Sequence, residues 1–325
     1  MKHYKCSSVG IVGAGIQGVC IGLQLIKKGI SVSIFDKNDP GKMTSYGNAG
    51  HFSPYAVLQL NRPDVLYDVP KMLFSSYGPL ALKWNYIPKM FNWFLHYLKN
   101  CNKKSMLHTA KYMHQILSLS NDAYEEIFQE INVDGLVEKK GIIYVWTNRN
   151  LKSRKLEIKV RDDLGVKQKL LTREEILELE PNLNPVFDAG VIFENAMHAR
   201  DPHGILKEIF KLYIKRGGKF IQSDINSIEQ KTANETIIKS ANDVYRFEKT
   251  VIASGAFSKK LTDQLGENIP LDTERGYHVH FKDKDKLISR PVIFLDRGFG
   301  MTPMNQGLRA VGTVELGGLK NPPSK

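Results

Sequence analysis

The sequence predicts an α/β protein of two interleaved domains, one with a parallel βαβ sheet and one with a mixed β-sheet plus helices. Its 325 residues correspond to roughly two domains at about 150 residues each. The chain opens with strand, helix and strand, and a buried strand ending in a glycine turn recurs at 250–255. No linker separates these segments, so we expect the domains to interleave rather than follow one another.

The composition and net charge are those of a folded, basic protein with few cysteines. Hydrophobic residues make up 42% and charged residues 25% of the chain, which supports a sizeable core and excludes wholesale disorder. The 46 basic and 34 acidic residues leave a formal charge of +12, which favours an anionic cofactor, nucleic acid or a membrane surface. Three scattered cysteines, Cys6, Cys20 and Cys101, form neither a disulfide framework nor a zinc site, so we expect a reducing, cytoplasmic setting.

The apolar stretch 9–26 follows a basic segment, as the core of a signal peptide does. It carries Gln17 and Gln24, however, and no small-residue cleavage site follows it. Lys27-Lys28-Gly29 ends it too early for a comfortable membrane span. We therefore expect neither secretion nor a membrane-spanning helix here.

The N-terminal segment predicts a strand over Ser8–Val12, a helix that runs to Lys28 and a second strand over 30–35. The turn between the first strand and the helix reads Gly13-x-Gly15-x-x-Gly18, and Asp36 follows the second strand. This arrangement is the context in which a glycine-rich turn binds a dinucleotide.

Each part of the motif has a role in such binding. Gly13 allows the tight turn, Gly15 lets the backbone approach a pyrophosphate, and Gly18 lets helix and strand pack closely. The helix N-terminus offers unpaired amides to the phosphates, and Asp36 accepts hydrogen bonds from ribose hydroxyls. The motif thus predicts a Rossmann-type domain, with a packing turn in an ordinary α/β domain as the alternative. It does not distinguish FAD from NAD.

The next segment favours FAD. The run Thr44-Ser45-Tyr46-Gly47-Asn48-Ala49-Gly50-His51 is small, polar and rich in glycine. Such a segment suits backbone that passes under a flavin and hydroxyls that meet its phosphates and ribityl chain. A simple surface loop is the alternative on composition alone.

Helices and strands alternate through the rest of the chain. Helices are expected over 89–98, over 107–131 and over the basic stretch 150–169. Two more have start signals: Thr172-Arg173-Glu174-Glu175 reads as a capping box, and Asp201-Pro202 as a cap with a first-turn proline. Strands are expected over 141–147, 219–222, 225–230, 236–239, 250–253 and 273–281.

Several motifs occur in the order found in one protein family. They are the glycine turn with Asp36, the run 45–50, the run 250–256, Glu274-Arg275-Gly276-Tyr277-His278, and Met301-Thr302-Pro303 with Gly312-Thr313-Val314-Glu315-Leu316. With them the chain resembles the FAD-dependent D-amino-acid oxidoreductases, most closely the D-amino-acid dehydrogenase-like flavoproteins. The resemblance implies a Rossmann-type FAD-binding domain from 1–50 and 196–270. A substrate domain of mixed β-sheet and helices would comprise 51–195 and 271–325.

The resemblance also implies where FAD binds. Ser254-Gly255 would lie near the pyrophosphate, Ile225 would place its backbone against the adenine, and Gly276 would let the backbone approach the flavin. The residues expected to bind FAD are Gly13, Ala14, Gly15, Ile16, Gln17, Gly18, Asp36, Lys37, Ser45, Asn48, Ala49, Gly50, Ile225, Ser254 and Gly255.

Proteins of this family continue past the point that corresponds to 321–325, with further sheet, a glycine-rich loop at the flavin ring and a last helix. We therefore expect the C-terminal segment of the FAD-binding domain to be absent from this sequence. A truncated, non-catalytic remnant or one half of a split protein then stands beside a working enzyme as an alternative.

The family reaction implies hydride transfer from the α-carbon of an amino acid to flavin N5, followed by hydrolysis of the imine to a 2-oxo acid and ammonia. The protein must hold the α-carbon about 3–3.5 Å from the acceptor and bind the carboxylate, for which a basic side chain and a phenol are natural partners. The candidates are Tyr277, His51, Arg297 and Tyr144, each with a structural role as the alternative. Close oxidases often have an arginine after the late-strand proline, where this chain has Met304, so the carboxylate anchor stays open.

Oxidation of a D-amino acid is therefore the expected activity, with oxidation of glycine or an N-methyl amino acid as the alternative. The expected partners are the amino acid and an electron acceptor such as a quinone. The aromatic, lysine-rich segment 70–104 would suit peripheral contact with the cytoplasmic face of a membrane, but a buried substrate-domain helix is favoured. No nucleic-acid motif accompanies the lysine-rich stretch 139–169, and His278 and His280 lack further ligands for a metal.

Overall fold

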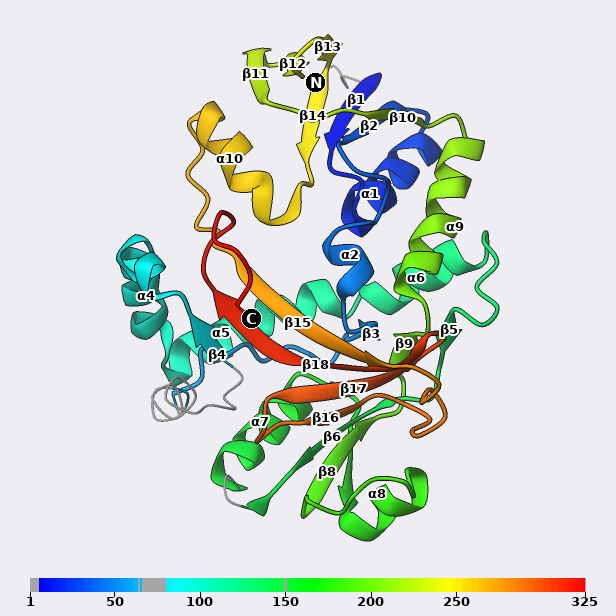
Figure 1. Ribbon diagram of the computed structural model, residues 1–325, viewed down its shortest axis with the longest axis vertical. Helices are drawn as coiled ribbons and strands as arrows, with labels where there is room; N and C mark the ends of the chain where they lie inside the picture. The colour runs from blue at the N-terminus through cyan, green and yellow to red at the C-terminus, as the bar shows by residue number, and fades with distance from the viewer. Residues whose placement is uncertain (1–5, 64, 66–79, 149–150, 325) are drawn as a thin grey trace. The chain divides into compact units, whose positions relative to one another are not determined.

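The computed structural model describes residues 6–63, 65, 80–148 and 151–324. The chain divides into two compact units (Figure 1). Unit 1 comprises Met1–Asn48, Ile127–Val133 and Pro202–Leu271, and unit 2 comprises Ala49–Glu126, Asp134–Asp201 and Asp272–Lys325. The chain passes between the units several times, and the predicted α/β fold is confirmed. The roles assigned to the two parts, FAD binding and substrate binding, stay predictions.

Unit 1 is built on a parallel sheet in the order β10-β2-β1-β14. Its strands are β1 (Ser8–Val12), β2 (Ser31–Asp36), β10 (Lys219–Gln222) and β14 (Lys249–Ile252). Ile11, Ile34 and Phe35 are fully buried, as in a parallel sheet covered on both faces. Helices α1 (Ile16–Lys27) and α9 (Pro202–Lys215) pack against each other (Figure 1). The strand, turn, helix and strand predicted for the N-terminus are confirmed.

A three-stranded antiparallel sheet packs on the parallel sheet of unit 1. It consists of β11 (Ser227–Thr232), β12 (Glu235–Lys239) and β13 (Val244–Phe247). The sequence does not predict β13, because its alternation of apolar and polar residues is too short to separate from a turn. Tertiary packing fixes this strand: the rings of Tyr245 and Phe247 lie 4.8 and 5.8 Å from that of Phe35.

Short elements complete unit 1. They are the helices α2 (Thr44–Gly47) and α10 (Ser258–Thr262) and the 3₁₀ turns Gly255–Phe257 and Asp263–Leu265. The segment 44–51, expected to pass under a flavin with a surface loop as the alternative, begins with the helical turn α2. Its Tyr46 ring lies edge-on to His203 of α9, with 5.4 Å between ring centroids, and this contact stabilises the turn.

Unit 2 is built on a mixed sheet in the order β15-β18-β17-β16-β6-β8-β7, with β4 beside β18 (Figure 1). Its strands are β4 (Leu80–Leu82), β6 (Ile142–Trp146), β7 (Lys169–Thr172), β8 (Ala189–Phe193), β15 (Glu274–Phe281), β16 (Val292–Phe294), β17 (Phe299–Met304) and β18 (Gly307–Leu316). Only the pairs β6–β16 and β4–β18 of this sheet, as described, are parallel. A smaller antiparallel sheet has the order β3-β9-β5, from His51–Phe52, Met197–Ala199 and Val137–Glu138.

Five further helices lie along the described chain: α4 (Ile87–Asn100) after the 3₁₀ turn Trp84–Tyr86, α5 (Lys103–Leu117), α6 (Ser120–Phe128), α7 (Leu151–Asp163) and α8 (Arg173–Leu179). The single helix predicted over 107–131 is wrong. Ser120 donates its hydroxyl to the Leu117 carbonyl at 2.7 Å, and a side chain that takes a backbone acceptor competes with helical hydrogen bonding. The helix predicted over 150–169 ends at Asp163. The capping box of α8 is confirmed, with Thr172 and Glu175 each bonding the other's backbone N–H.

Helix α4 corrects one interpretation. The segment 70–104 is predicted as a buried substrate-domain helix, and its part before Leu80 lies outside the described residues. In α4 only Met90 is buried, while Phe91 is 57% and Leu95 is 49% exposed, so the interpretation is wrong for this helix. No helix in the described part of the chain is long and apolar enough to cross a bilayer.

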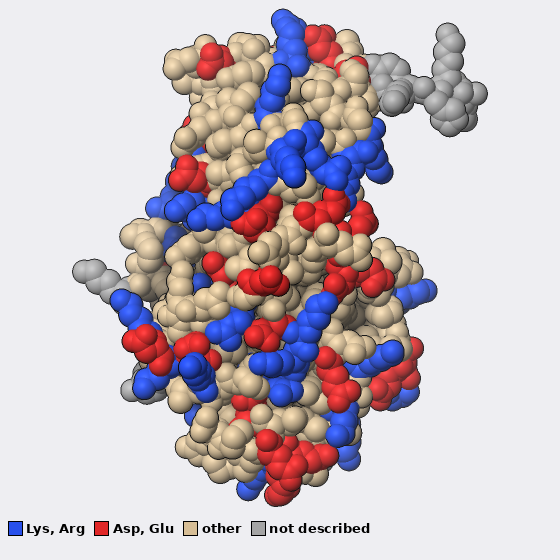
Figure 2. Space-filling view, turned by 90° about the vertical axis from the view of Figure 1, so that its right-hand side faces the viewer, with Lys and Arg blue, Asp and Glu red and all other residues tan. Residues whose placement is uncertain are grey.

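Basic side chains are prominent on the side of the molecule where α9 lies (Figure 2). Lys207, Lys211 and Lys215 follow one another at helical spacing and are exposed. The opposite face of α9 buries Ile205 and Ile209, so the helix is amphipathic. This part of the positive charge lies on an ordinary solvated helix face and needs no anionic partner.

Candidate functional site

The glycine turn of unit 1 joins β1 to the N-terminus of α1. Gly13 has a φ of +117°, and its amide donates to the Phe35 carbonyl at 2.7 Å. A Cβ on Gly13 would lie 2.3 Å from the Ala253 carbonyl oxygen, and one on Gly18 would lie 1.9 Å from the Gly13 carbonyl oxygen. Backbone atoms thus leave no room for a side chain at either position, which gives the tight turn and close helix–strand packing of a dinucleotide motif.

Gly15 differs from both because it faces open space. Among the described residues, the only heavy atom within 4 Å of a Cβ built there is the Ser45 hydroxyl oxygen, at 3.3 Å. The backbone is extended, with φ −73° and ψ 177°, a conformation that any residue adopts. Glycine at this position therefore preserves the space in front of the backbone rather than a special conformation, as close approach of a phosphate requires.

The first turn of α1 is suited to an anion. Gly15 is its N-cap and supplies no side chain, and the turn carries no acidic residue. The Ile16 amide donates to Ser45 Oγ at 3.0 Å, so the polar 45–50 segment begins at this helix end. The positive end of the helix dipole and the first-turn amides attract negative charge.

Asp36 lies at the end of β2, beside the turn. Its Oδ2 accepts from the Ala14 amide and its Oδ1 from the Asn38 amide, each at 2.9 Å. Each carboxylate oxygen has a further lone pair, so both can still accept from a ribose hydroxyl. Neighbouring Lys37 is exposed, with its ammonium 5.4 Å from the centre of the Phe257 ring.

Two more predicted residues follow β14, at the edge of the parallel sheet where β1 ends in the glycine turn. Ser254 donates its hydroxyl to the Val12 carbonyl at 2.9 Å, and Gly255 has a φ of +55° and is exposed. Ile225 lies with its side chain in the core of unit 1, in the same cluster as Val12. An open glycine, an anion-attracting helix end and a carboxylate therefore share one sheet edge, and these residues fit the pyrophosphate and ribose of FAD.

The predicted residue His51 lies in unit 2, at the start of β3. Its Nε2 is 2.8 Å from Thr302 Oγ1 on β17, and the Thr302 hydroxyl donates to the Ala49 carbonyl at 3.0 Å. Burial lowers the pKa of His51 to about 4, so its ring is neutral at neutral pH. The sequence does not identify Thr302 as the partner of His51, because a threonine within a strand gives no signal of a contact 251 residues away.

His198 is a second buried histidine, and sequence reasoning missed it. It pairs with His51 across β3 and β9 and is fully buried. Neither of its ring nitrogens has a hydrogen-bond partner among the described residues. Burial, and then the neighbouring His51, lower the pKa of His198 to about 3. Both imidazoles are therefore kept neutral inside unit 2.

Gly50 is confined between two strands of unit 2. Its φ is +74°, and a Cβ there would lie 2.8 Å from the Ala199 carbonyl oxygen and 2.9 Å from Met304 Cε. The Ala199 amide donates to the Gly50 carbonyl at 2.6 Å. Met304 is itself buried, so the position after the late-strand proline contributes an apolar side chain to this point.

Tyr277 is half-buried and contacts the buried carboxylate of Glu315. Its hydroxyl donates to Glu315 Oε2 at 3.1 Å and accepts from the Ser324 amide at 3.0 Å. Glu315 is 1% exposed and pairs with Arg275 at 2.5 Å. Burial alone would raise the pKa of Glu315, but hydrogen bonds from Ser324 and Tyr277 and the charge of Lys83 bring it below its ordinary value. The phenol is thus engaged in holding a carboxylate of the protein.

The other two candidates lie apart from His51. Arg297 is exposed in the turn between β16 and β17, and no contact joins it to His51 among the described residues. Tyr144 packs in the core of unit 2, with its ring 5.6 Å from that of Tyr55 and the Arg161 guanidinium 6.0 Å above it. Burial raises the pKa of Tyr144. The described contacts thus do not gather the predicted catalytic residues around His51.

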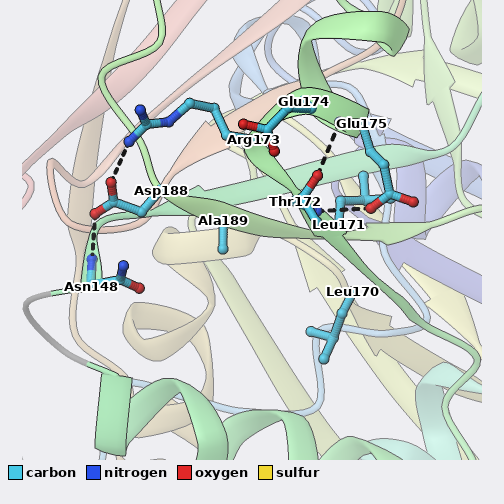
Figure 3. Close-up of a pocket in the computed structure, with 9 residues that line it drawn as sticks. All are labelled: Asn148, Leu170, Leu171, Thr172, Arg173, Glu174, Glu175, Asp188 and Ala189. Atoms are coloured by element: carbon cyan, nitrogen blue, oxygen red, sulfur yellow. Dashed lines mark hydrogen bonds and ion pairs between the residues drawn. The ribbon is translucent and has the colours of Figure 1, made fainter.

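A surface hollow of unit 2 lies at the N-terminus of α8 (Figure 3). Arg173 reaches across it to Asp188 at 2.5 Å, and the Asn148 amide donates to the same carboxylate at 2.8 Å. Thr172 is used in capping the helix. The polar groups of this hollow bond one another, and no predicted site residue lines it, so it is not the candidate site.

Comparison with known proteins matches the chain to one family. The family model described as DAO, FAD dependent oxidoreductase, matches residues 8–324. A D-amino-acid oxidase of Bradyrhizobium diazoefficiens is 30% identical over 319 residues, which cover 97% of this chain and 76% of that protein. A D-amino acid dehydrogenase of Helicobacter pylori is 25% identical over 311 residues, which cover 95% of this chain and 74% of that protein.

A solved structure shares the fold. The glycine oxidase of Geobacillus kaustophilus superposes with a TM-score of 0.68 at 18% identity, over 98% of this chain and 74% of that chain. The resemblance stated from the motifs is confirmed, as are the oxidoreductase class and FAD as cofactor. The chain belongs to the DAO family of FAD-dependent oxidoreductases.

Proposed function

We propose that this enzyme oxidises the C–N bond of a D-amino acid. The observation that carries the proposal is the match of 97% of the chain to a D-amino-acid oxidase. FAD, when bound, supplies the hydride acceptor. A D-amino acid and water then give a 2-oxo acid and ammonia, and two electrons and two protons pass to the electron acceptor.

Different residues of the chain are assigned to different parts of FAD and to the substrate. We assign the phosphates of FAD to the first-turn amides of α1 and the open backbone at Gly15, and the ribose to Asp36. Of the predicted catalytic residues, His51 is retained for contact with substrate, because its neutral ring lies next to the predicted flavin-binding residues Ala49 and Gly50. Tyr277, which holds Glu315, is assigned a structural role.

The test is anaerobic reduction of the bound flavin. A panel of D-amino acids should remove the visible flavin absorbance, and the matching L-amino acids should leave it. Pyruvate and ammonia should appear in equal amounts when D-alanine reduces the flavin. Absence of reduction across a broad D-amino-acid panel, with FAD bound, would contradict the proposal.

Oxidation of glycine or an N-methyl amino acid is the second candidate, and the shared fold of the Geobacillus kaustophilus glycine oxidase favours it. Identity of 18% supports the fold alone, so the D-amino-acid assignment stands first. Glycine and sarcosine with oxygen as acceptor distinguish the two. Rapid formation of hydrogen peroxide from either substrate, with slow turnover of D-alanine, would favour the second candidate.

We further infer that a membrane quinone accepts the electrons and that α4 makes the peripheral contact. Phe91, Phe94, Leu95 and Leu98 are 57%, 38%, 49% and 38% exposed along this helix, an unusual gathering of apolar side chains in solvent. The lysines of α4, Lys89 and Lys99, suit anionic lipid headgroups. Sedimentation with anionic vesicles tests the contact, and Phe91→Ser with Leu95→Ser should abolish it.

A further inference from the structure

We propose that Thr302 is a positioning residue for the cofactor site and holds the Ala49–Gly50 peptide through one buried hydroxyl. The proposal rests on the proposed function, since the role of Ala49 and Gly50 in FAD binding is itself proposed. The Ala49 carbonyl, the Thr302 hydroxyl and the His51 imidazole are together called the relay. All three groups belong to unit 2.

The Thr302 hydroxyl forms both hydrogen bonds of the relay. Thr302 is 0% exposed in β17, inside the mixed sheet. Its Oγ1 lies 3.0 Å from the Ala49 carbonyl oxygen and 2.8 Å from His51 Nε2. A rigid central strand thereby fixes a segment that precedes it by about 250 residues.

The protons of the relay follow from its chemistry. A carbonyl oxygen only accepts, so the single hydroxyl proton of Thr302 goes to Ala49. His51 Nε2 must then carry a proton and donate it to Thr302, and Nδ1 must be the bare nitrogen. Since His51 is neutral above about pH 4, this arrangement holds at neutral pH.

The next peptide, Gly50–His51, is held by backbone. The Ala199 amide of β9 bonds the Gly50 carbonyl, and Gly50 has a φ of +74° with no room for a Cβ. Two consecutive carbonyls are therefore fixed, one by β9 and one by the Thr302 side chain. A segment ordered before its ligand arrives loses less entropy on binding, and this is the gain we assign to the relay.

The experiment compares three threonine variants of the full chain. Thr302→Val keeps the shape of the side chain and removes the hydroxyl, whereas Thr302→Ser keeps the hydroxyl. Thr172→Val is the matched control, because the Thr172 hydroxyl also bonds backbone in unit 2 but caps α8. The readouts are the FAD dissociation constant, from flavin fluorescence, and the thermal midpoint of the FAD-free protein.

The expected result is a rise of tenfold or more in the FAD dissociation constant for Thr302→Val, with Thr302→Ser within about threefold of the wild type. Thr172→Val should lower the thermal midpoint and leave FAD binding unchanged. Wild-type affinity in Thr302→Val, or an equal loss in Thr302→Ser, would overturn the role of the hydroxyl. Failure of the wild-type chain to bind FAD would overturn the proposed function instead.

A second measurement does not depend on the folding of Thr302→Val. In wild-type protein labelled with ¹⁵N-histidine, the His51 spectrum should show a protonated Nε2 and a bare Nδ1 at neutral pH, assigned by loss of the signals in His51→Gln. The opposite tautomer would break the proton order of the relay and overturn the proposal, even if Thr302→Val does not fold.

Discussion

The glycine turn of unit 1 and the relay of unit 2 both hold backbone next to proposed FAD positions, but they do so by different means. In the turn, carbonyl oxygens occupy the space where a Cβ of Gly13 or Gly18 would lie. In the relay, a threonine hydroxyl from a distant strand bonds the backbone. A site shaped by backbone depends on the absence of side chains, and a site shaped by a side chain depends on one specific group.

The largest expected effect comes from filling the turn. Gly18→Ala would place a Cβ 1.9 Å from the Gly13 carbonyl oxygen, so α1 and β1 must move apart. We expect a loss of at least about 4 kcal/mol of unfolding free energy, measured by denaturant titration with circular dichroism. Gly29→Ala is the control, since no heavy atom from the described part of the chain lies within 4 Å of its Cβ, and its φ of +77° should cost only about 1 kcal/mol. Equal losses in the two variants would contradict this account.

Gly15→Val separates binding from folding within the same turn. The backbone conformation accepts valine, and the added Cβ would lie 3.3 Å from the Ser45 hydroxyl oxygen, the end of a small side chain that can turn away. The thermal midpoint of the FAD-free protein should therefore change little. The dissociation constant for FAD should rise by about a thousandfold, or about 4 kcal/mol, because the side chain takes the space of the phosphates. Flavin retained during purification and equilibrium titration measure the effect. Unchanged flavin content would place the pyrophosphate elsewhere.

The same contrast explains which parts of the fold and site the sequence predicts. The Gly13–Gly18 turn, Asp36 and the α8 capping box are local, so spacing alone identifies them. Strand β13, the break between α5 and α6, and the His51–Thr302 contact depend on groups brought together only by the tertiary fold. Nothing in the sequence around His198 indicates that it is buried, since a histidine in a short strand is equally common at the surface.

Acid should lower the free energy of unfolding, because the buried rings of His51 and His198 are neutral in the folded chain. The folded protein lowers the pKa of His51 from 6.5 to about 4 by burial, while the unfolded chain keeps the ordinary value. Between these values the unfolded state binds more protons, so stability is highest above the unfolded pKa and falls as pH drops toward 4. His51 alone should contribute roughly 3 kcal/mol to this fall, and His198 adds to it.

Denaturant titrations from pH 7 to pH 4 measure this dependence. His51→Gln should flatten the slope, whereas the control His108→Gln, which changes an exposed histidine, should leave it as it is. An equal slope in the wild type and His51→Gln would show that the ring is not held neutral by burial.

The smallest expected effect concerns Tyr277 and asks whether a side chain on the large sheet of unit 2 acts in catalysis or in packing. Tyr277→Phe removes one hydrogen bond to the buried Glu315, which keeps its ion pair with Arg275. The unfolding free energy should fall by about 1–2 kcal/mol, and kcat/KM for a D-amino acid should stay within about twofold of the wild type. Because the Ser324 amide also donates to Glu315 Oε2, it keeps an acceptor when the phenol is lost. A loss of a hundredfold or more in kcat/KM, with stability unchanged, would instead show that the Tyr277 hydroxyl contacts the substrate. A side chain of the large sheet would then act in the site, as the Thr302 hydroxyl does in the relay.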